Sequence, residues 1–279
     1  MNRTSRASIA QETVEIANRG WYEPTTGKRV DISAAMDRCL SGTTLYRPAE
    51  LDGLGVVAAD YDTVFEVANE TSLAAARRLV VDRGHAATMC LNFASAKNPG
   101  GGFLGGSQAQ EESLARSSGL YRSLLSQGGY YEANRSCGTC LYTDNMIFSH
   151  DVPVFRDNAG CLLPEPYCLN IVTAPAPNAG AVRKNEPERA SEIGPTLSRR
   201  IARLLALAAH KGCEHLILGA WGCGVFRNDP AEVASLFAAA LGSERFRNRF
   251  RTIVFAVLDT AEDERTIAPF RRDWRSFHA

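Results

Sequence analysis

Residues 86–112 read AATMCLNFASAKNPGGGFLGGSQAQEE: an apolar run, a glycine-rich loop and the start of a polar helix. The apolar run at 86–95 is short and bounded by turn residues, so it predicts a buried strand. Five of the seven residues from Gly100 to Gly106 are glycine. Glycines allow positive φ angles and a close approach of the backbone to a ligand, and free amides before a helix favour an anion. A diphosphate is the natural ligand for such a loop.

This loop matches neither of the two common nucleotide-binding signatures. No Gly-Lys-Ser/Thr follows it, and its glycines do not have the G-x-G-x-x-G spacing. Glu111 and Glu112 come next, at the start of the helix, where acidic side chains ordinarily stabilise the helix dipole and cap free amides. On the local pattern alone, capping is the simpler interpretation. Five glycines give more backbone freedom than a stable cap needs, so a catalytic interpretation stays open.

The rest of the chain alternates strands and helices. We expect strands at 63–69, 145–149, 167–173, 215–221 and 252–259, and helices at 72–84, 107–125, 196–212 and 230–241. This alternation predicts an α/β fold, a three-layer α/β/α sandwich around a mixed or mostly parallel sheet. Residues 1–50 are polar and turn-rich, and they predict an N-terminal accessory segment packed on the main domain, residues 51–279.

Three local patterns give more detailed expectations. The helix at 196–212 has apolar residues at the spacing of one buried face, namely Ile201, Leu204, Leu205 and Ala208. The helix at 107–125 is expected to begin at a Ser107 cap and to carry one apolar face, namely Leu114, Tyr121, Leu124 and Leu125. The segment between the strands at 145–149 and 167–173 is expected to form a loop, because it contains Pro153, Pro164 and Pro166.

Length and composition indicate an ordinary soluble globular chain. With 279 residues, 45% hydrophobic and 22% charged, the chain suits one large domain. The formal net charge is zero, which argues against a broad phosphate-tracking surface, so no direct DNA binding is expected. The sequence contains no apolar run of 18 residues and begins with a polar stretch. These features predict a cytoplasmic protein with no membrane association.

Cysteines and histidines form no recognisable metal or nucleophile motif. Eight cysteines are too few for a disulfide scaffold of this length, so reduced thiols are expected. Cys137 and Cys140 have the CxxC spacing, but no second CxxC or histidine pair completes a zinc site. Two free thiols in a loop are the simpler interpretation. The five histidines are scattered, and we expect neither a metal nor a cofactor.

A resemblance to a known family adds a function to these patterns. Gly100-Gly101-Gly102, seven further residues and then Gln110-Glu111-Glu112 resemble the GGG-x6-8-QEE signature of poly(ADP-ribose) glycohydrolases. The flanking text resembles the bacterial-type branch of that family: LNFASAKNPGGG, SLARSSGLY, YTDNMIFSHDVPVFRD, PAPNAGA and GAWGCGVFRNDP. The resemblance extends over nearly the whole chain. It implies a macrodomain that binds the terminal ADP-ribose of a polymer and hydrolyses its 1″–2′ O-glycosidic bond. We expect the protein to be a monomer that acts on poly-ADP-ribosylated proteins.

The resemblance also implies roles for individual residues. Glu112 matches the general acid, Glu111 the carboxylate that holds the adjoining ribose hydroxyls, and Asn98 a residue that hydrogen-bonds the distal ribose. Further residues match substrate-binding positions, namely Gly100, Gly101, Gly102 and Gln110 around the ribose, Gly222, Cys223, Gly224, Val225 and Phe226 around the diphosphate and sugar, and Glu70 with Thr71 at the adenine.

The implied chemistry fits a single working carboxyl group. Neighbouring helical residues point about 100° apart, so Glu111 and Glu112 are not expected to flank one bond as acid and nucleophile. Instead, Glu112 would protonate the departing 2′ oxygen, and the resulting carboxylate would activate water. Two alternatives share the fold: a reader that binds ADP-ribose without turnover, and a hydrolase that removes single ADP-ribose units from proteins.

Overall fold

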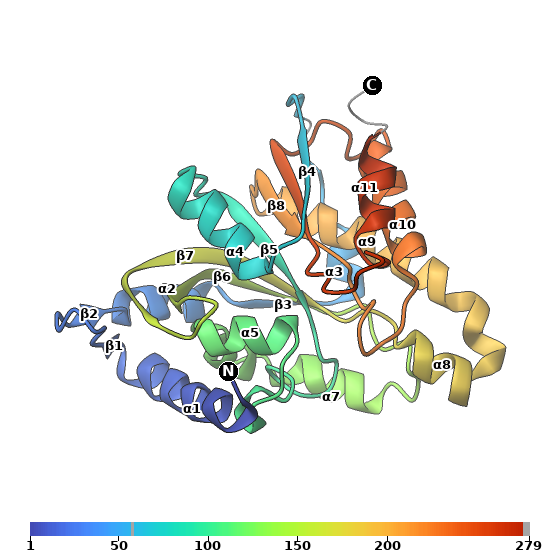
Figure 1. Cartoon of the computed structure of the whole chain (residues 1–279). Helices are drawn as coiled ribbons and strands as arrows, with labels where there is room; N and C mark the ends of the chain where they lie inside the picture. Colours follow the sequence, from blue (N-terminus) through green and yellow to red (C-terminus); the bar gives the residue numbers. More distant parts are fainter. Residues whose placement is uncertain (57–58, 276–279) are drawn as a thin grey trace.

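The structure is a computed structural model that describes residues 1–56 and 59–275, and its centre is a seven-stranded sheet (Figure 1). The strands are β3 (Thr44–Tyr46), β4 (Val64–Ala68), β5 (Thr88–Phe93), β6 (Met146–Arg156), β7 (Leu162–Ala174), β8 (His215–Leu218) and β9 (Thr252–Ala256). Their spatial order is β3-β6-β7-β5-β8-β9-β4. Strands from β7 to β4 run parallel, whereas β6 is antiparallel to both β3 and β7. The sheet is therefore mixed.

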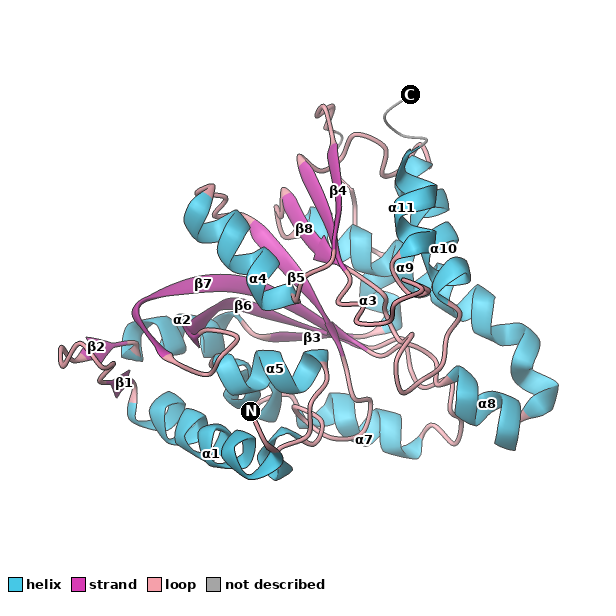
Figure 2. Ribbon diagram, in the orientation of Figure 1, coloured by secondary structure: helices cyan, strands magenta, loops and turns pink. Residues whose placement is uncertain are grey.

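Helices cover both faces of this sheet (Figure 2). One layer contains α3 (Pro48–Asp52), α8 (Ala179–Asn185), α9 (Ile193–His210), α10 (Pro230–Gly242) and α11 (Ala268–Arg275). The other contains α2 (Ser33–Gly42), α4 (Ser72–Arg77), α5 (Gln110–Ser117), α6 (Leu120–Leu125) and α7 (Gly128–Ser136). Successive residues of a strand point to opposite faces. Accordingly, Met89 and Leu91 of β5 pack in the first layer and Cys90 in the second. The predicted three-layer α/β/α fold is confirmed.

The predicted amphipathic helix is confirmed in α9, which buries its apolar face completely. The four residues expected on that face are each 0% exposed: Ile201, Leu204, Leu205 and Ala208. The helix predicted from Pro230 is also confirmed as α10, and the Asp229 side chain caps it by accepting a hydrogen bond from the Ala231 N–H. Proline at the first helical position is favoured because its missing N–H would be unpaired there.

The helix predicted at 107–125 is wrong in its continuity and its cap. It is divided into α5 and α6, because Ser118 adopts an extended conformation with φ of −150° and Gly119 follows it. The N-cap of α5 is Ala109, not Ser107, which belongs to the glycine loop. Leu125 was expected on the buried face, but the residue is 53% exposed, because the break at Ser118 interrupts the helical periodicity that begins in α5.

The loop predicted between residues 149 and 167 is also wrong. Pro153 lies within β6 opposite Cys168, and Pro164 and Pro166 lie within β7. Pro153 is tolerated because β3 pairs with β6 only at residues 146–148. Pro164 and Pro166 are tolerated because they lie in an irregular stretch of β7, between the pairs Tyr167–Val154 and Leu162–Arg156, and β5 pairs with β7 only from Asn170 onward. A missing N–H on the open side of a strand breaks no ladder hydrogen bond.

The N-terminal segment contributes to both the sheet and the glycine loop. It begins with α1 (Arg3–Arg19) and a small hairpin of β1 (Trp21–Tyr22) and β2 (Val30–Asp31), and it also supplies edge strand β3. In Figure 1, α1 (dark blue) runs beneath α5 (green), and it packs against α5 and the 3-10 turn Phe103–Gly105. The division at residue 50 therefore stays a prediction.

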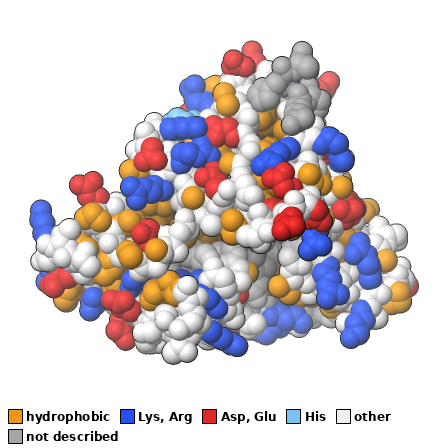
Figure 3. All heavy atoms as spheres, in the orientation of Figure 1, with side chains coloured by type: hydrophobic (Ala, Val, Ile, Leu, Met, Phe, Trp, Pro, Cys, Tyr) orange, Lys and Arg blue, Asp and Glu red, His pale blue; other side chains and the backbone are white. Residues whose placement is uncertain are grey.

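The surface carries no dominant charge on the face shown in Figure 3, where basic, acidic and apolar side chains are interspersed. This distribution agrees with the formal net charge of zero. Within the described ranges, no helix is long and apolar enough to cross a membrane.

Candidate active site

Glu111 is buried in the first turn of α5, with 3% of the residue exposed. Its Oε2 accepts a hydrogen bond from the backbone N–H of Ser95 at 2.6 Å, and its Oε1 accepts one from Nδ2 of Asn92 at 3.2 Å. Asn92 lies near the end of β5, and Ser95 lies in the loop that follows. Both carboxyl oxygens are therefore held by the strand end from which the glycine loop departs.

Burial controls the protonation of Glu111. Its removal from water raises the pKa of this carboxyl to about 8, although the Ser95 amide and Asn92 act in the opposite direction. This raised pKa favours the protonated form of Glu111 at neutral pH. A neutral Glu111 places no net negative charge beside Glu112.

Glu112 is directed toward the glycine loop and is only partly buried. Its Oε1 accepts a hydrogen bond from the backbone N–H of Gly102 at 3.1 Å. No donor from the described part of the chain contacts its Oε2. Glu112 thus has one anchored and one available carboxyl oxygen, which is the arrangement that proton transfer to a ligand requires.

Gly101 lies directly against both carboxyl groups. A Cβ atom at this position would lie 2.5 Å from Oε1 of Glu112 and 3.3 Å from Oε2 of Glu111. Gly101 also has a φ of +58°, a conformation that costs other residues free energy. Its N–H donates to the backbone oxygen of Asn98 at 3.0 Å, which closes the turn. The exposed Asn98 side chain has no hydrogen-bond partner among the residues described here.

The second loop, residues 222–226, offers free amides. The backbone N–H groups of Gly224, Val225 and Phe226 donate to no acceptor within the described ranges. Gly222 makes the tight turn possible, because its φ is +74° and a Cβ there would lie 2.5 Å from Cβ of Ala176. Three successive unpaired amides form a concave donor surface of the kind that binds phosphate groups.

Phe226 packs against the core, whereas Val225 is open to solvent. The Phe226 ring lies 5.8 Å, centroid to centroid, from the ring of Tyr142 and packs against the main core. Val225 is 83% exposed. Phe226 can therefore present one edge to a bound sugar without losing its support.

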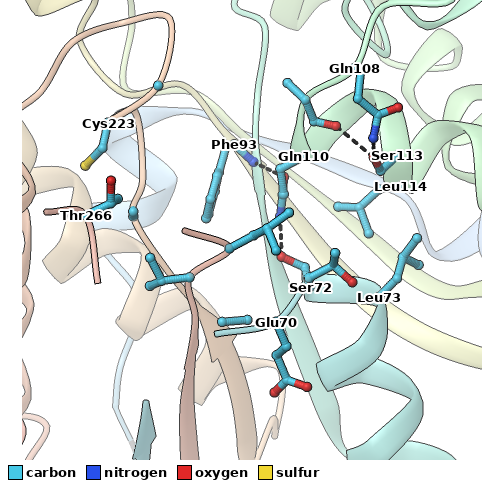
Figure 4. A pocket seen from close by; sticks show the side chains of 17 residues that line it. Glu70, Ser72, Leu73, Phe93, Gln108, Gln110, Ser113, Leu114, Cys223 and Thr266 are labelled. Atoms are coloured by element: carbon cyan, nitrogen blue, oxygen red, sulfur yellow. Dashed lines mark hydrogen bonds between the residues drawn. The ribbon is translucent and has the colours of Figure 1, made fainter. Parts of the chain in front are cut away.

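A cavity of about 370 Å³ adjoins the second loop at Cys223 and the start of α5 at Gln110 (Figure 4). Five residues expected at the substrate line it: Glu70, Thr71, Gln110, Cys223 and Gly224. Figure 4 shows Cys223 and Thr266 on one side and Gln110 and Ser113 on the other. The remaining expected residues are outside its lining. Of these, Gly100–Gly102, Glu111 and Glu112 meet at the start of α5, while Val225 and Phe226 lie in the second loop.

Gln110 is bonded on every side by the protein. Its Oε1 accepts from the Phe93 N–H at 2.9 Å, and its Nε2 donates to Oγ of Ser72 at 3.0 Å and to the Leu91 oxygen at 2.7 Å. Gln110 therefore joins the start of α5 to β5 and α4. This contact fixes the direction in which the next two residues, Glu111 and Glu112, leave the helix.

Glu70 and Thr71 form the far end of the cavity. Oε1 of Glu70 pairs with Nη2 of Arg78 at 2.6 Å, and no donor among the described residues contacts its Oε2. Thr71 caps α4 by accepting from the Ala74 N–H and donates to Oδ1 of Asn158. One carboxylate oxygen of Glu70 thus remains able to accept a hydrogen bond from a ligand.

Comparisons with known proteins agree with one another. A family model described as the catalytic domain of microbial-type PARG matches residues 10–157. The structure of poly(ADP-ribose) glycohydrolase (PARG) from Thermomonospora curvata is 49% identical with a TM-score of 0.91, covering 97% of this chain and all of that one. This chain belongs to the microbial-type PARG family. The family is one of glycosidases, and the chain is a poly(ADP-ribose) glycohydrolase.

Ligand-bound PARG structures show the same likeness. The Thermomonospora curvata enzyme bound to the inhibitor ADP-HPD is 48% identical with a TM-score of 0.89, covering 97% of this chain and 99% of that one. PARG from Deinococcus radiodurans in complex with ADP-ribose is 47% identical with a TM-score of 0.82, covering 88% and 99%. No curated protein sequence matches the chain with significance.

Several PARG site residues escaped the sequence analysis. Asn92 and Ser95 hold Glu111, Arg78 holds Glu70, and Phe93 lines the cavity. Asn92 did carry a signal, because an asparagine inside an apolar strand must find polar partners when buried. No sequence pattern indicated the contact between Arg78 and Glu70, because an arginine at this distance along the chain is an ordinary residue of a helix surface.

Neither cysteine of the CxxC pair lines the cavity. Cys137 and Cys140 are free thiols. Within the described ranges, no three metal-ligating side chains of histidine, cysteine, aspartate or glutamate come together.

Proposed function

We propose that Glu112 is the general acid of this glycohydrolase and that the chain releases ADP-ribose from the free end of the polymer. The observation that carries the proposal is the difference between the two carboxyl groups: both oxygens of Glu111 have protein donors, whereas Oε2 of Glu112 has none among the described residues. Glu112 alone combines a fixed position with an available oxygen.

The reaction follows from this placement. The carboxyl group of Glu112 gives its proton to the 2′ oxygen as the bond from that oxygen to C1″ breaks, leaving an oxocarbenium-like sugar. The Glu112 carboxylate then takes a proton from water as the water oxygen bonds to C1″, which restores the acid. Both oxygens of Glu111 accept hydrogen bonds from the protein, and in this proposal Glu111 binds the adjoining ribose hydroxyls and forms no bond to C1″.

Substrate binding uses the two loops and the cavity. The unpaired amides of Gly224, Val225 and Phe226 bind the diphosphate, and the edge of Phe226 contacts the distal ribose next to Asn98. The available Oε2 of Glu70 accepts a hydrogen bond from the exocyclic amine of adenine. Arg78 supports that contact by holding the other oxygen.

The test is Glu112→Gln, which keeps the size of the side chain and its contact with Gly102 but removes the acid. General acid catalysis is worth about 10²–10⁴-fold, so polymer hydrolysis should fall by at least about 100-fold. ADP-ribose affinity, measured by calorimetry, should change little. Glu132→Gln, an exposed glutamate on α7, is the control and should retain full activity.

The same assay separates the alternative activities. Wild-type protein is incubated with poly-ADP-ribosylated and with mono-ADP-ribosylated protein, and released ADP-ribose is measured. Release from the polymer alone supports the proposal. Release from both substrates indicates that protein-linked single units are also removed, and binding without release indicates a reader. Wild-type rates in Glu112→Gln would overturn the role of Glu112.

We further propose that the enzyme acts as a monomer on poly-ADP-ribosylated proteins. Large apolar side chains are exposed singly, at separated places such as Val64, Leu104, Leu125 and Leu258. Scattered exposed residues of this kind are normal for a monomer. Light scattering should give the mass of one chain, and a dimer mass would contradict the proposal.

A further inference from the structure

A second cavity of about 320 Å³ adjoins the first. The two cavities share four lining residues: Thr71, Leu73, Gln108 and Ser113. Two residues of the second cavity's lining, Ser113 and Arg116, follow Glu112 on α5 by one residue and by one turn. The second cavity is not needed to explain the binding of one ADP-ribose unit.

Two arginines line this second cavity, Arg6 of α1 and Arg116 in the last turn of α5. Arg6 donates through Nε to the Gly106 oxygen at 2.7 Å and through Nη1 to the Met1 oxygen at 2.8 Å. All of these acceptors are neutral. Among the described residues, Arg6 has no carboxylate partner.

Arg116 is likewise bonded only to neutral groups. Its Nη1 donates to the Ser107 oxygen at 3.2 Å and its Nη2 to Oε1 of Gln108 at 2.5 Å. Only 5% of Arg116 is exposed. A guanidinium carries five N–H donors, so Arg116 retains donors for a further acceptor.

The two guanidinium groups repel one another. Burial lowers the pKa of Arg116, and the nearby charge of Arg6 lowers it further, while Glu112 one turn earlier acts in the opposite direction. Asp157 is the single carboxylate among the residues that line this cavity. Its Oδ1 accepts from the N–H groups of Ala159 and Cys161, so it serves its own turn. An anion bound between the arginines would relieve their repulsion.

We propose that the second cavity is a subsite for the diphosphate of the next ADP-ribose unit in the polymer, the unit that is joined through its 2′ oxygen to C1″ of the bound unit beside Glu112. The proposal rests on the proposed function, because only a polymer presents a second diphosphate at a fixed distance from the first. Arg6 and Arg116 supply the bidentate donors that suit phosphate oxygens. Occupation of both sites makes the second contact intramolecular, so the polymer binds more tightly than the monomer.

The experiment compares Arg6→Gln with Arg3→Gln. Both arginines lie on α1 and hold carbonyl groups of the glycine loop, since Arg3 donates to the Gly105 oxygen at 2.9 Å and Arg6 to that of Gly106. Of Arg3 and Arg6, only Arg6 lines the second cavity. Arg3→Gln therefore controls for the loss of a contact between α1 and the loop.

For Arg6→Gln we expect the KM for long polymer to rise about tenfold, which corresponds to one lost charge-assisted contact. The change in kcat should be much smaller, and the Kd of monomeric ADP-ribose should stay near the wild-type value. The KM of Arg6→Gln should also depend less steeply on salt concentration. Arg6→Lys should restore part of the affinity, and Arg3→Gln should retain the wild-type KM.

Two results would overturn the subsite. The first is an unchanged polymer KM in both Arg6→Gln and Arg116→Lys. The second is an equal rise in Arg3→Gln and Arg6→Gln, because that would reflect the loop contact. Failure of the proposed function is distinguishable from both: wild-type protein would then release no ADP-ribose from polymer under any condition.

Discussion

Gly101 leaves no room for a side chain beside Glu112, since a Cβ atom on Gly101 would lie 2.5 Å from Oε1 of that glutamate. Oε1 of Glu112 therefore packs directly against the backbone of Gly101. Any residue other than glycine at position 101 must displace the carboxyl group that the reaction uses.

Gly101→Ala should lower kcat by at least about tenfold, because even small misplacement of a catalytic group is costly. The φ of +58° adds a destabilisation of about 1–2 kcal/mol. Steady-state kinetics and urea unfolding measure the two effects. Gly27→Ala is the matched control: Gly27 has a φ of +75°, and nothing lies within 4 Å of its Cβ position. It should lose similar stability and keep its activity. Equal kcat values in both variants would refute the packing argument.

Glu111→Gln should stabilise the protein at neutral pH. Burial raises the pKa of Glu111 to about 8 from an ordinary value of 4.5. The folded protein therefore retains a proton that the unfolded chain loses, and stability declines as pH rises from about 4.5 to about 8. Glutamine cannot ionise, so this decline should largely disappear in the variant, a difference of more than about 2 kcal/mol at pH 8.

Urea unfolding at several pH values measures this difference. At pH 4 the glutamate is protonated in both states, so the two proteins should have nearly equal unfolding free energies there. That low-pH pair is the internal control. Parallel pH profiles for wild type and Glu111→Gln would show that the carboxyl is ionised in the folded protein.

The sequence predicted those parts of the fold that rest on local periodicity. The buried face of α9 follows directly from the spacing of Ile201, Leu204, Leu205 and Ala208, and the strand β5 follows from its apolar run. The prolines of β6 and β7 were misjudged for a physical reason. Whether proline is tolerated in a strand depends on which neighbouring strands are present, and that is a property of the assembled sheet.

The candidate site was also predicted in part. The stretch from Gly100 to Glu112 is continuous in sequence, so its resemblance to the family signature identified the residues that meet at the start of α5. The sequence could not predict that both oxygens of Glu111 accept hydrogen bonds from the protein, because this depends on Ser95 and Asn92 approaching Glu111 after folding. The contact of α1 with the glycine loop joins residues about 100 positions apart, and no periodic pattern reports it.

Arg200→Lys should lower the unfolding free energy of the protein and weaken the support of Phe226 by Tyr142. Arg200 is fully buried, pairs with Asp144 at 2.6 Å and donates to the backbone oxygens of Leu141, Tyr142 and Pro175. Lysine cannot make this planar set of contacts. We expect a loss of about 1–3 kcal/mol in unfolding free energy for each buried backbone oxygen that is left without a donor.

The Kd of ADP-ribose should also rise in Arg200→Lys, because Tyr142 supports the ring of Phe226. Arg199→Gln is the control: this side chain is 47% exposed and pairs with the same Asp144. It should cost no more than about 1 kcal/mol and leave the Kd unchanged. Equal effects in both variants would assign the stabilisation to Asp144 alone.

His215→Gln should make the protein more resistant to acid. The rings of His85 and His215 stack with centroids 3.9 Å apart, and Nδ1 of each is buried without a partner in the described structure. Burial lowers the pKa of His215 to about 4, and the charge of His85 adds to this effect. The folded state thus favours the neutral ring, so stability present above pH 6.5 is lost as pH falls toward 4.

Thermal unfolding between pH 7 and pH 4 should show a loss of unfolding free energy at least about 1 kcal/mol smaller in His215→Gln than in wild type. His210→Gln removes an exposed histidine at the end of α9 and should keep the wild-type profile. An unchanged acid profile in His215→Gln would show that the stacked pair does not set the acid limit of this fold.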